Sequence, residues 1–288
     1  MRWLLLGTMA VWGANLSVVK LLFESLEPML VAVLRMAVSA LALSAVLVWR
    51  RLPWPRLRRS QWLTLAACAV LMIYLNQIFF TEGVARTAAA NAALIIALNP
   101  LVSALTAALL LGDRLTPSRI GGVVLGFGGV AAVVLHRPGA VLGSGGLGDL
   151  LMFGSVLTWV FGGVLVQRLA RELDSGLISA VMGVIGSALL ALHLGLRPAP
   201  VVVHWALVTP LTVALLVVSS LLATAAGALV WNRALVVIGV ARTALYAYWV
   251  PIFGVLFAVL LLGEPLTVWH GIGLAAVLGG TWLGTRRH

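Results

Sequence analysis

Almost the whole chain consists of uncharged, apolar runs of about 20 residues, separated by short segments that carry charge, proline or glycine. A run of about this length crosses the roughly 30 Å hydrocarbon core of a bilayer as one helix. With 62% of the 288 residues hydrophobic and only 9% charged, little sequence remains for a water-soluble domain. Because backbone polar groups inside a bilayer must bond within the protein, we predict an all-α polytopic membrane protein.

The breaks between the apolar runs predict ten transmembrane helices. The opening run continues to Leu22 with no small-residue cleavage site where a secretory signal needs one, so we expect it to be a retained first helix. The expected helices cover residues 3–22, 28–49, 62–82, 88–111, 117–136, 148–170, 176–196, 208–231, 241–262 and 267–285.

Basic residues are distributed unevenly between the two sides of the predicted bundle. With a cytoplasmic N-terminus, 14 basic residues fall in cytoplasmic segments and four outside, namely Lys20, Arg86, Arg137 and Arg197. Such an excess on the cytoplasmic side is the topological signal of membrane proteins. We therefore assign the net charge of +11 to topology and not to nucleic-acid binding, and expect a multi-pass membrane protein with both termini cytoplasmic.

The chain offers few groups for metal, cofactor or proton chemistry. Cys68 is the single cysteine, so neither a disulfide nor a thiolate metal site is expected, and we predict no cofactor and no metal. The eight acidic residues and five histidines are all expected at helix ends or in loops. Because proton-coupled transport needs a titratable group along the path, this placement favours facilitated diffusion or exchange.

The two halves of the sequence repeat each other. The hexapeptide GVARTA stands at 83–88 and again at 239–244. Further on, NPLVSALTAALLLGDRLT at 99–116 matches VPIFGVLFAVLLLGEPLT at 250–267. The matches indicate a duplication, with a first five-helix repeat at 1–140.

The second repeat is predicted at 147–288 and is inverted relative to the first. An odd number of spans in each repeat forces the second copy to enter the membrane from the opposite side. Inverted repeats are a recurring architecture of secondary transporters, with the substrate site near the bilayer midplane where the repeats meet. The fold class we predict is therefore ten transmembrane helices arranged as two inverted five-helix repeats.

These features resemble the drug/metabolite transporter (DMT) superfamily, EamA family. The resemblance is carried by the duplication, by Pro100 and Pro251, by the LLLGD and LLLGE helix ends, and by the glycine-rich fifth and tenth helices. Within the family the chain is most similar to the YddG-type amino-acid exporters, which implies a location in the bacterial inner (plasma) membrane. That resemblance implies a basket of ten helices with a central cavity, alternating access, and export of aromatic and other neutral amino acids or similar small metabolites.

Other functions fit parts of the pattern. A multidrug exporter or another small-metabolite exporter of the same superfamily is the alternative within this class. An intramembrane enzyme would need a catalytic dyad inside the bilayer, and no such pair stands in the sequence. A non-transporting receptor would need longer loops or soluble domains for its partners. We therefore predict a transporter, not an enzyme.

Aromatic residues away from the predicted helix ends are the first candidates for a substrate pocket. Trp12 and Trp159 occupy matching positions in the middle of helices one and six, and Trp231 also lies deep. Rings with one polar tip can line a pocket that accepts an apolar side chain, or they can fill the core. The aromatic residues we nominate for substrate binding are Trp12, Tyr74, Trp159, Tyr246, Tyr248 and Trp249.

Uncharged polar residues inside the spans complete this candidate site. Asn15 lies three residues after Trp12 and Gln77 three residues after Tyr74, so each pair shares a helix face. Asn91 and Asn99 lie on the fourth helix. Together they can bind both ends of a zwitterion, or they can join neighbouring helices by hydrogen bonds.

Three further positions carry alternative roles. Pro100 and Pro251 fall near the centres of helices four and nine, where proline kinks a helix, and we nominate them as gating hinges or as static kinks. Arg35 is the one charge well inside a span and corresponds to Met182 in the second repeat. It can anchor a substrate carboxylate, extend toward the interface, or pair with acidic residues near its helix.

Glycines permit close backbone approach in the fifth and tenth helices. They either pack the two halves together or form a dimer face, so the protein is expected to be a monomer or a homodimer. The glycines concerned are Gly121, Gly122, Gly126, Gly128, Gly129, Gly273, Gly279, Gly280 and Gly284.

Overall fold

The computed structural model is helical throughout the part of the chain that it describes, apart from turns and one isolated backbone bridge between Leu26 and Val203. This confirms the predicted all-α class. The described residues are 1–49, 51, 56–84, 86, 95–112, 114–136, 146–198, 200–262 and 267–285.

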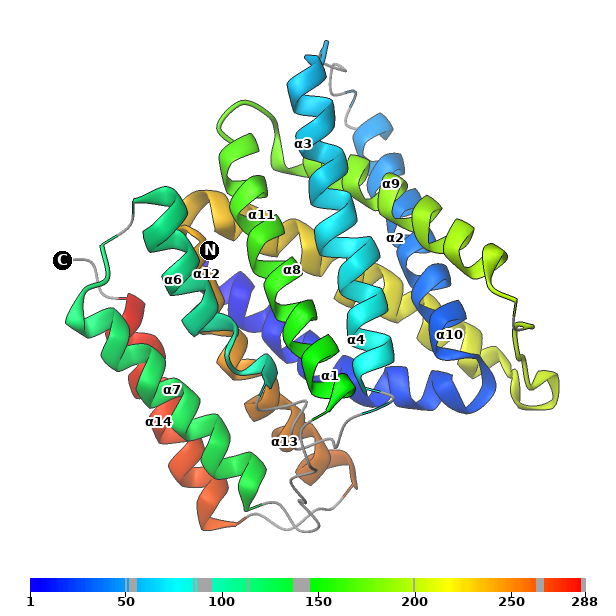
Figure 1. The fold of residues 1–288 in the computed structure, drawn as a ribbon. Coiled ribbons are helices and arrows are strands. Elements are labelled where there is room, and N and C mark those ends of the chain that lie inside the picture. The colour runs from blue at the N-terminus through cyan, green and yellow to red at the C-terminus, as the bar shows by residue number, and fades with distance from the viewer. Residues whose placement is uncertain are drawn as a thin grey trace.

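The helices of the first half follow the expected apolar runs closely (Figure 1). The third run is one continuous rod made of α3, the π-helix η1 and α4. The elements are α1 (Arg2–Ser25), α2 (Pro28–Trp49), α3 (Arg59–Ala69), η1 (Val70–Leu75), α4 (Asn76–Val84), α6 (Asn99–Leu111) and α7 (Pro117–Leu135).

The second half has a similar succession of elements, with the short elements η2, α12 and η4 in addition to those described in the first half. Its third run is again interrupted by a π-helix, η3, and it extends seven residues past the expected end at 231. The elements are α8 (Leu147–Leu169), α9 (Ser175–Leu196), η2 (Trp205–Leu207), α10 (Pro210–Val218), η3 (Ser219–Ala226), α11 (Gly227–Ile238), α12 (Val240–Leu245), η4 (Tyr246–Tyr248), α13 (Trp249–Leu262) and α14 (Val268–Thr285).

Five helices of the described chain are long and apolar enough to cross a membrane by length and composition. They are Pro28–Trp49, Arg59–Gly83, Leu147–Leu169, Ser175–Leu196 and Pro210–Ile238. Large apolar side chains also cover the outside of the bundle, with Trp3 84% exposed and Trp49 81% exposed near helix ends. That surface suits lipid and interfacial contact. The count of ten spans stays a prediction.

The fourth run differs from its prediction as one helix over 88–111. Residues 97–98 form a turn, and α6 begins at Asn99, so Pro100 occupies its first turn. Proline suits this position, because the backbone N–H that it lacks would have no partner in the helix. The expectation that Pro100 lies near the middle of a continuous helix is therefore wrong for the described residues.

The ninth run is also divided. The short helix α12 passes through the single 3₁₀ turn η4 into α13, and Pro251 is the third residue of α13. In both runs the helical geometry changes just before the proline, so the bend precedes the residue that the sequence marks. Gating at these two positions stays a prediction.

Helices of the two halves interleave, and they do not form separate bundles. The helix pairs α2 and α9, α4 and α8, and α1 and α13 pack together, each joining one half to the other. A main core of buried residues lies between α1, α3, α8, α9 and α11. A second core joins α6, α7, α12, η4 and α14.

The glycine-rich helices α7 and α14 lie side by side (Figure 1). A Cβ atom on Gly122 would lie 2.6 Å from the backbone nitrogen of Gly284 and 2.7 Å from the carbonyl oxygen of Gly280. The two helix backbones are therefore too close at this point for any side chain between them. Of the two roles left open by the sequence, Gly122, Gly129 and Gly280 have the packing of the two halves within one chain.

Candidate functional site

Three tryptophans from three helices meet where the two halves join. Trp12 of α1 lies edge-on to Trp159 of α8, with ring centroids 6.1 Å apart and an interplanar angle of 74°. Trp231 of α11 lies 5.4 Å from Trp12 and 5.6 Å from Trp159 by the same measure. Contacts of this geometry contribute about 0.5–1.5 kcal/mol each beyond the burial of area. The predicted pair Trp12 and Trp159 is thus brought together, with Trp231 added; these three residues are the tryptophan cluster.

The π-helix η3 forms hydrogen bonds with the polar groups of Trp12 and Asn15 beside this cluster. Trp12 donates its Nε1–H to the carbonyl oxygen of Ala223 at 2.7 Å. One turn further along α1, Asn15 accepts a hydrogen bond from the hydroxyl of Ser219 at 2.6 Å. Both residues therefore face the same neighbour, as their spacing predicts. A π-helical segment interrupts the regular backbone ladder, which leaves carbonyls open to side-chain donors, and such segments are frequent at functional sites.

Arg35 of α2 reaches the same segment from the other side. Its Nη2 donates to the hydroxyl of Thr224 at 3.1 Å, and its Nε is buried without a hydrogen-bond partner in the described chain. Among the described residues no carboxylate pairs with it, because Glu27 pairs with Arg197 instead. Of the alternatives left open, pairing with Glu24 or Glu27 is therefore wrong.

Space for the Trp12 ring depends on Gly227, the first residue of α11. A Cβ atom at this position would lie 2.6 Å from the indole nitrogen of Trp12. The residue after the π-helix must therefore be glycine for the indole to reach Ala223. The sequence shows this glycine but not its purpose, because the contact joins residues more than 200 positions apart.

The other nominated residues of the third span face a different helix. The hydroxyl of Tyr74 lies 3.2 Å from Nδ1 of His193 on α9, and the two rings are in contact. Gln77 is half-buried on α4. The structure therefore places Tyr74 against α9 and not in the tryptophan cluster, and a role of Tyr74 or Gln77 in binding stays a prediction.

The remaining nominated residues lie within helix packing. Asn99 is buried and accepts a hydrogen bond from Ser103 one turn later on α6. Tyr246 is buried in the main core. The Tyr248 hydroxyl donates to the carbonyl of Val123 at 3.0 Å, and its ring lies against α7. Trp249 donates to the Thr281 hydroxyl at 3.2 Å.

Two nominated positions receive no side-chain description. Asn91 lies outside the described residues. Pro251 lies in α13, with only its backbone described. The structure thus gathers Trp12, Asn15 and Trp159 at one place and distributes the other described candidates over the bundle. Sequence reasoning noted the depth of Trp231 without nominating it for binding, and it did not consider Ser219 and Thr224. A signal for them exists in the run of small polar residues that interrupts the apolar eighth span.

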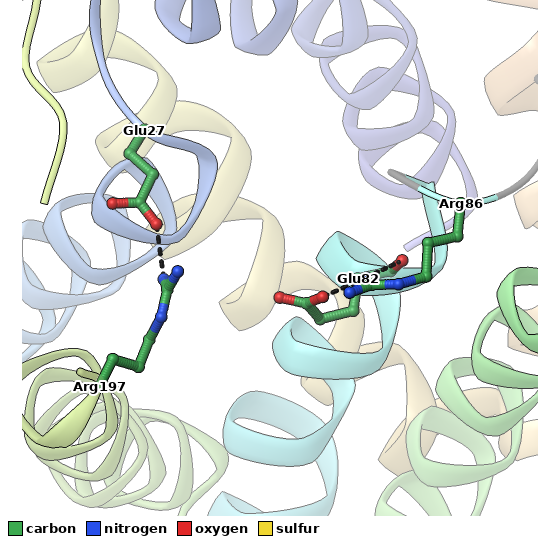
Figure 2. A network of polar contacts seen from close by, with 4 residues as sticks. All are labelled: Glu27, Glu82, Arg86 and Arg197. Carbon is green, nitrogen blue, oxygen red and sulfur yellow. Dashed lines mark hydrogen bonds and ion pairs between the residues drawn. The ribbon is translucent and has the colours of Figure 1, made fainter. Parts of the chain in front are cut away.

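Charged residues gather at one end of the bundle, formed by the turn between α1 and α2 and by the segment after α9, here called the α1–α2 end. Figure 2 shows Glu27 facing Arg197, with the separate pair Glu82 and Arg86 at the end of α4. The carboxylate of Glu27 and Nη1 of Arg197 are 2.5 Å apart. Backbone bonds reinforce the junction, since His204 N–H donates to Ser25 at 2.9 Å.

Two small cavities open at the α1–α2 end. The larger, of about 200 Å³, is lined by Phe23, Leu26, Glu27, Pro28, Val202 and His204. The smaller, of about 110 Å³, is lined by Glu27, Pro28, Met29, Thr81, Glu82 and Arg197. Neither is lined by a residue nominated for binding. Within the described chain, no group of three His, Cys, Asp or Glu residues is arranged to hold a metal.

Removing the guanidinium of Arg197 is expected to destabilise the protein more than removing that of Arg86. Arg197→Gln leaves the less exposed carboxylate of Glu27 without its partner, which costs roughly 1–3 kcal/mol of unfolding free energy. Arg86→Gln breaks a more exposed pair within one helix, worth about 0.3–0.5 kcal/mol. Thermal midpoints of the two variants in detergent measure the difference. Equal midpoints would show that the Glu27–Arg197 pair does not hold this end together.

The sequence profile of the EamA-like transporter family matches residues 2–135 and 146–286. An uncharacterized transporter of Archaeoglobus fulgidus is 28% identical over 99% of this chain and 96% of its own length. The uncharacterized transporter YyaM of Bacillus subtilis is 25% identical over 96% of this chain and 90% of its own. A probable terminal-alkyne amino-acid exporter of Streptantibioticus cattleyicolor is 26% identical over 96% and 91%.

A protein of known crystal structure has the same fold. The two chains superpose with a TM-score of 0.80 at 20% sequence identity, over 97% of this chain and 94% of that one. At this identity the likeness concerns the fold alone.

Proposed function

Because the chain belongs to the EamA-like transporter family, which confirms the predicted resemblance, we propose that this transporter exports amino acids or similar small metabolites by alternating access. It would act in a bacterial inner membrane with both termini cytoplasmic, by facilitated diffusion or exchange. The chain is similar over nearly its whole length to a probable amino-acid exporter, which supports this substrate class.

The observation that carries the proposal is the exchange symmetry of the helix contacts. The sequence repeat pairs α1 with α8, α2 with α9, the α3–η1–α4 rod with the α10–η3–α11 rod, α6 with the α12–α13 run, and α7 with α14. The contact of α4 with α8 has its counterpart in α11 with α1. The contact of α2 with the second rod, at η3, has its counterpart in that of α9 with the first rod, at α3 and η1. Likewise α1 contacts α13 and α8 contacts α6.

Contacts that persist when the halves are exchanged support two inverted repeats. In such a pair, one half can adopt the arrangement of the other, so that a central site opens first to one side and then to the other. The tryptophan cluster and the polar groups on η3 lie between α1 and α2 of one half and α8 and α11 of the other. We place the substrate site there.

A counterflow assay tests the proposal. Purified protein in liposomes preloaded with one unlabelled amino acid is expected to accumulate the same labelled amino acid transiently, for at least one of a panel that includes phenylalanine, tryptophan, leucine and threonine. Protein-free liposomes are the control. Accumulation of none of these amino acids would contradict amino-acid export. A second panel, of unrelated small metabolites, would then be used to find the substrate of this protein.

A further inference from the structure

We infer that Arg35 recognises the carboxylate of the substrate, so that the transported class is small molecules with a free carboxylate and an apolar side chain. The inference rests on the proposed function and names the group that the site selects. It is carried by the position of a half-buried cation inside α2, by its unfilled hydrogen-bonding capacity and by its neighbours.

A charged side chain at the position of Arg35 costs free energy, which suggests that it serves the function of the protein. It lies seven residues into α2, about 10 Å from the start of the helix. Its counterpart in the second half is Met182, which is 3% exposed, so the fold at this depth accommodates an apolar side chain. A cation inside a bundle normally pairs with an acid, and no described carboxylate pairs with Arg35.

The guanidinium of Arg35 also has an N–H donor without an acceptor in the described chain. Nη2 donates to a neutral hydroxyl on Thr224, and the buried Nε has no acceptor in the described chain. The Nε–H and one Nη2–H of arginine point from the same edge of the planar group, which is the edge that binds a carboxylate through two parallel hydrogen bonds. A substrate carboxylate would supply both the missing acceptor and the missing negative charge.

The neighbours of Arg35 match the rest of such a substrate. Thr224, which Arg35 contacts, directly follows Ala223, whose carbonyl accepts from Trp12. The charged and the aromatic contacts are therefore made on adjacent residues of η3. A carboxylate on Arg35 would place a short apolar side chain toward Trp12 and the tryptophan cluster.

The cavities at the α1–α2 end lie on the same face of α2 as Arg35. Pro28 lines both of them, and Arg35 follows it by seven residues, which is two helical turns. Arg197 also lines the smaller cavity, but its guanidinium is engaged by Glu27. Of these two arginines, only Arg35 has no carboxylate partner among the described residues.

The test compares acids with their amides in proteoliposomes. Unlabelled L-phenylalanine, phenylacetate, L-phenylalaninamide and phenylacetamide compete against labelled L-phenylalanine, or against whichever carboxylate the wild type exchanges best. In the wild type each acid is expected to compete at least about tenfold better than its amide, as loss of one charged hydrogen-bonded contact predicts. In Arg35→Met this preference should disappear, and in Arg35→Lys it should be reduced.

Two controls separate recognition from folding. Arg171→Gln removes an exposed arginine of the α8–α9 connection and should keep the full preference for acids. Arg35→Met should retain the thermal midpoint of the wild type or exceed it, because it removes a half-buried cation that no described carboxylate pairs with. Thr224→Val should weaken competition by acids and amides unequally, since Thr224 orients Arg35.

The outcomes distinguish this inference from the proposed function. Exchange of amino acids with no preference for acids, or a preference that survives in Arg35→Met, would overturn the role of Arg35 and leave the transport function standing. If the wild type exchanges none of the carboxylates, the thermal midpoint of detergent-solubilised protein decides. Stabilisation by phenylacetate but not phenylacetamide, lost in Arg35→Met, would support Arg35, and no such difference would overturn it.

Discussion

Replacing Gly122 with alanine is expected to lower the free energy of unfolding by about 1–3 kcal/mol, the usual cost of overpacking a tight contact. The added Cβ would lie within 2.7 Å of backbone atoms of Gly280 and Gly284 on α14. Backbone cannot yield as the end of a side chain can. The two helices must therefore separate along the seam that joins the last helix of each half.

The same substitution at Gly128 is the matched control. Gly128 lies on the same helix, and an added Cβ would meet nothing within 4 Å. Alanine there should be neutral or stabilising by up to about 1 kcal/mol, because glycine is the weaker helix former. Thermal unfolding in detergent measures both variants. A midpoint shift of the same sign and size in the two would show that the α7–α14 approach contributes nothing to stability.

The positions of the helices could be predicted because apolar length is a property of each segment alone. The expected run 28–49 coincides with α2, and 117–136 differs from α7 by one residue. The eighth run was ended too early, at 231, since Arg233 was read as a helix boundary. The structure continues α11 to Ile238, because an arginine on a helix can extend its charge away from the apolar surface.

The changes of helix type could not be predicted in the same way. The π-helix η1 occurs in ordinary apolar sequence and η3 in a run of small residues, and neither composition predicts a change of helix type. Such segments persist only where neighbours compensate the interrupted backbone bonds. For η3 the compensation comes from Trp12 on α1, far away in the chain. Likewise, the sequence predicts a kink at Pro100 within one helix, whereas in the structure α6 begins at Asn99, because proline marks a perturbed region without showing on which side of it a helix begins or ends.

In the candidate site, too, features local to one helix could be predicted and features that depend on distant neighbours could not. The spacing of Trp12 and Asn15 on one helix correctly predicts that they face one neighbour, and the repeat correctly pairs Trp12 with Trp159. Tyr248 shows the opposite case. Its depth in the span suggested a pocket, but its hydroxyl is satisfied by a carbonyl of α7. Which side of a helix faces a cavity depends on its packing partners, which composition does not contain.

Replacing Trp12 with alanine is expected to weaken exchange of aromatic amino acids by about tenfold or more, which corresponds to roughly 1.4 kcal/mol of lost binding. The substitution removes the ring that contacts Trp159 and Trp231 and the donor to Ala223. Small substrates such as alanine should lose less, because they make less contact with the rings. The dependence of the counterflow rate on substrate concentration measures this difference.

Trp12→Phe separates the two contributions of the indole. Phenylalanine keeps an aromatic face but cannot donate to the carbonyl of Ala223, so it should retain most of the affinity for aromatic substrates if stacking dominates. Trp205→Ala is the matched control, since Trp205 is 78% exposed and lies in the separate short turn η2. If Trp12→Ala keeps the wild-type thermal midpoint and the wild-type affinity for every amino acid tested, the tryptophan cluster packs the halves together and the substrate binds elsewhere.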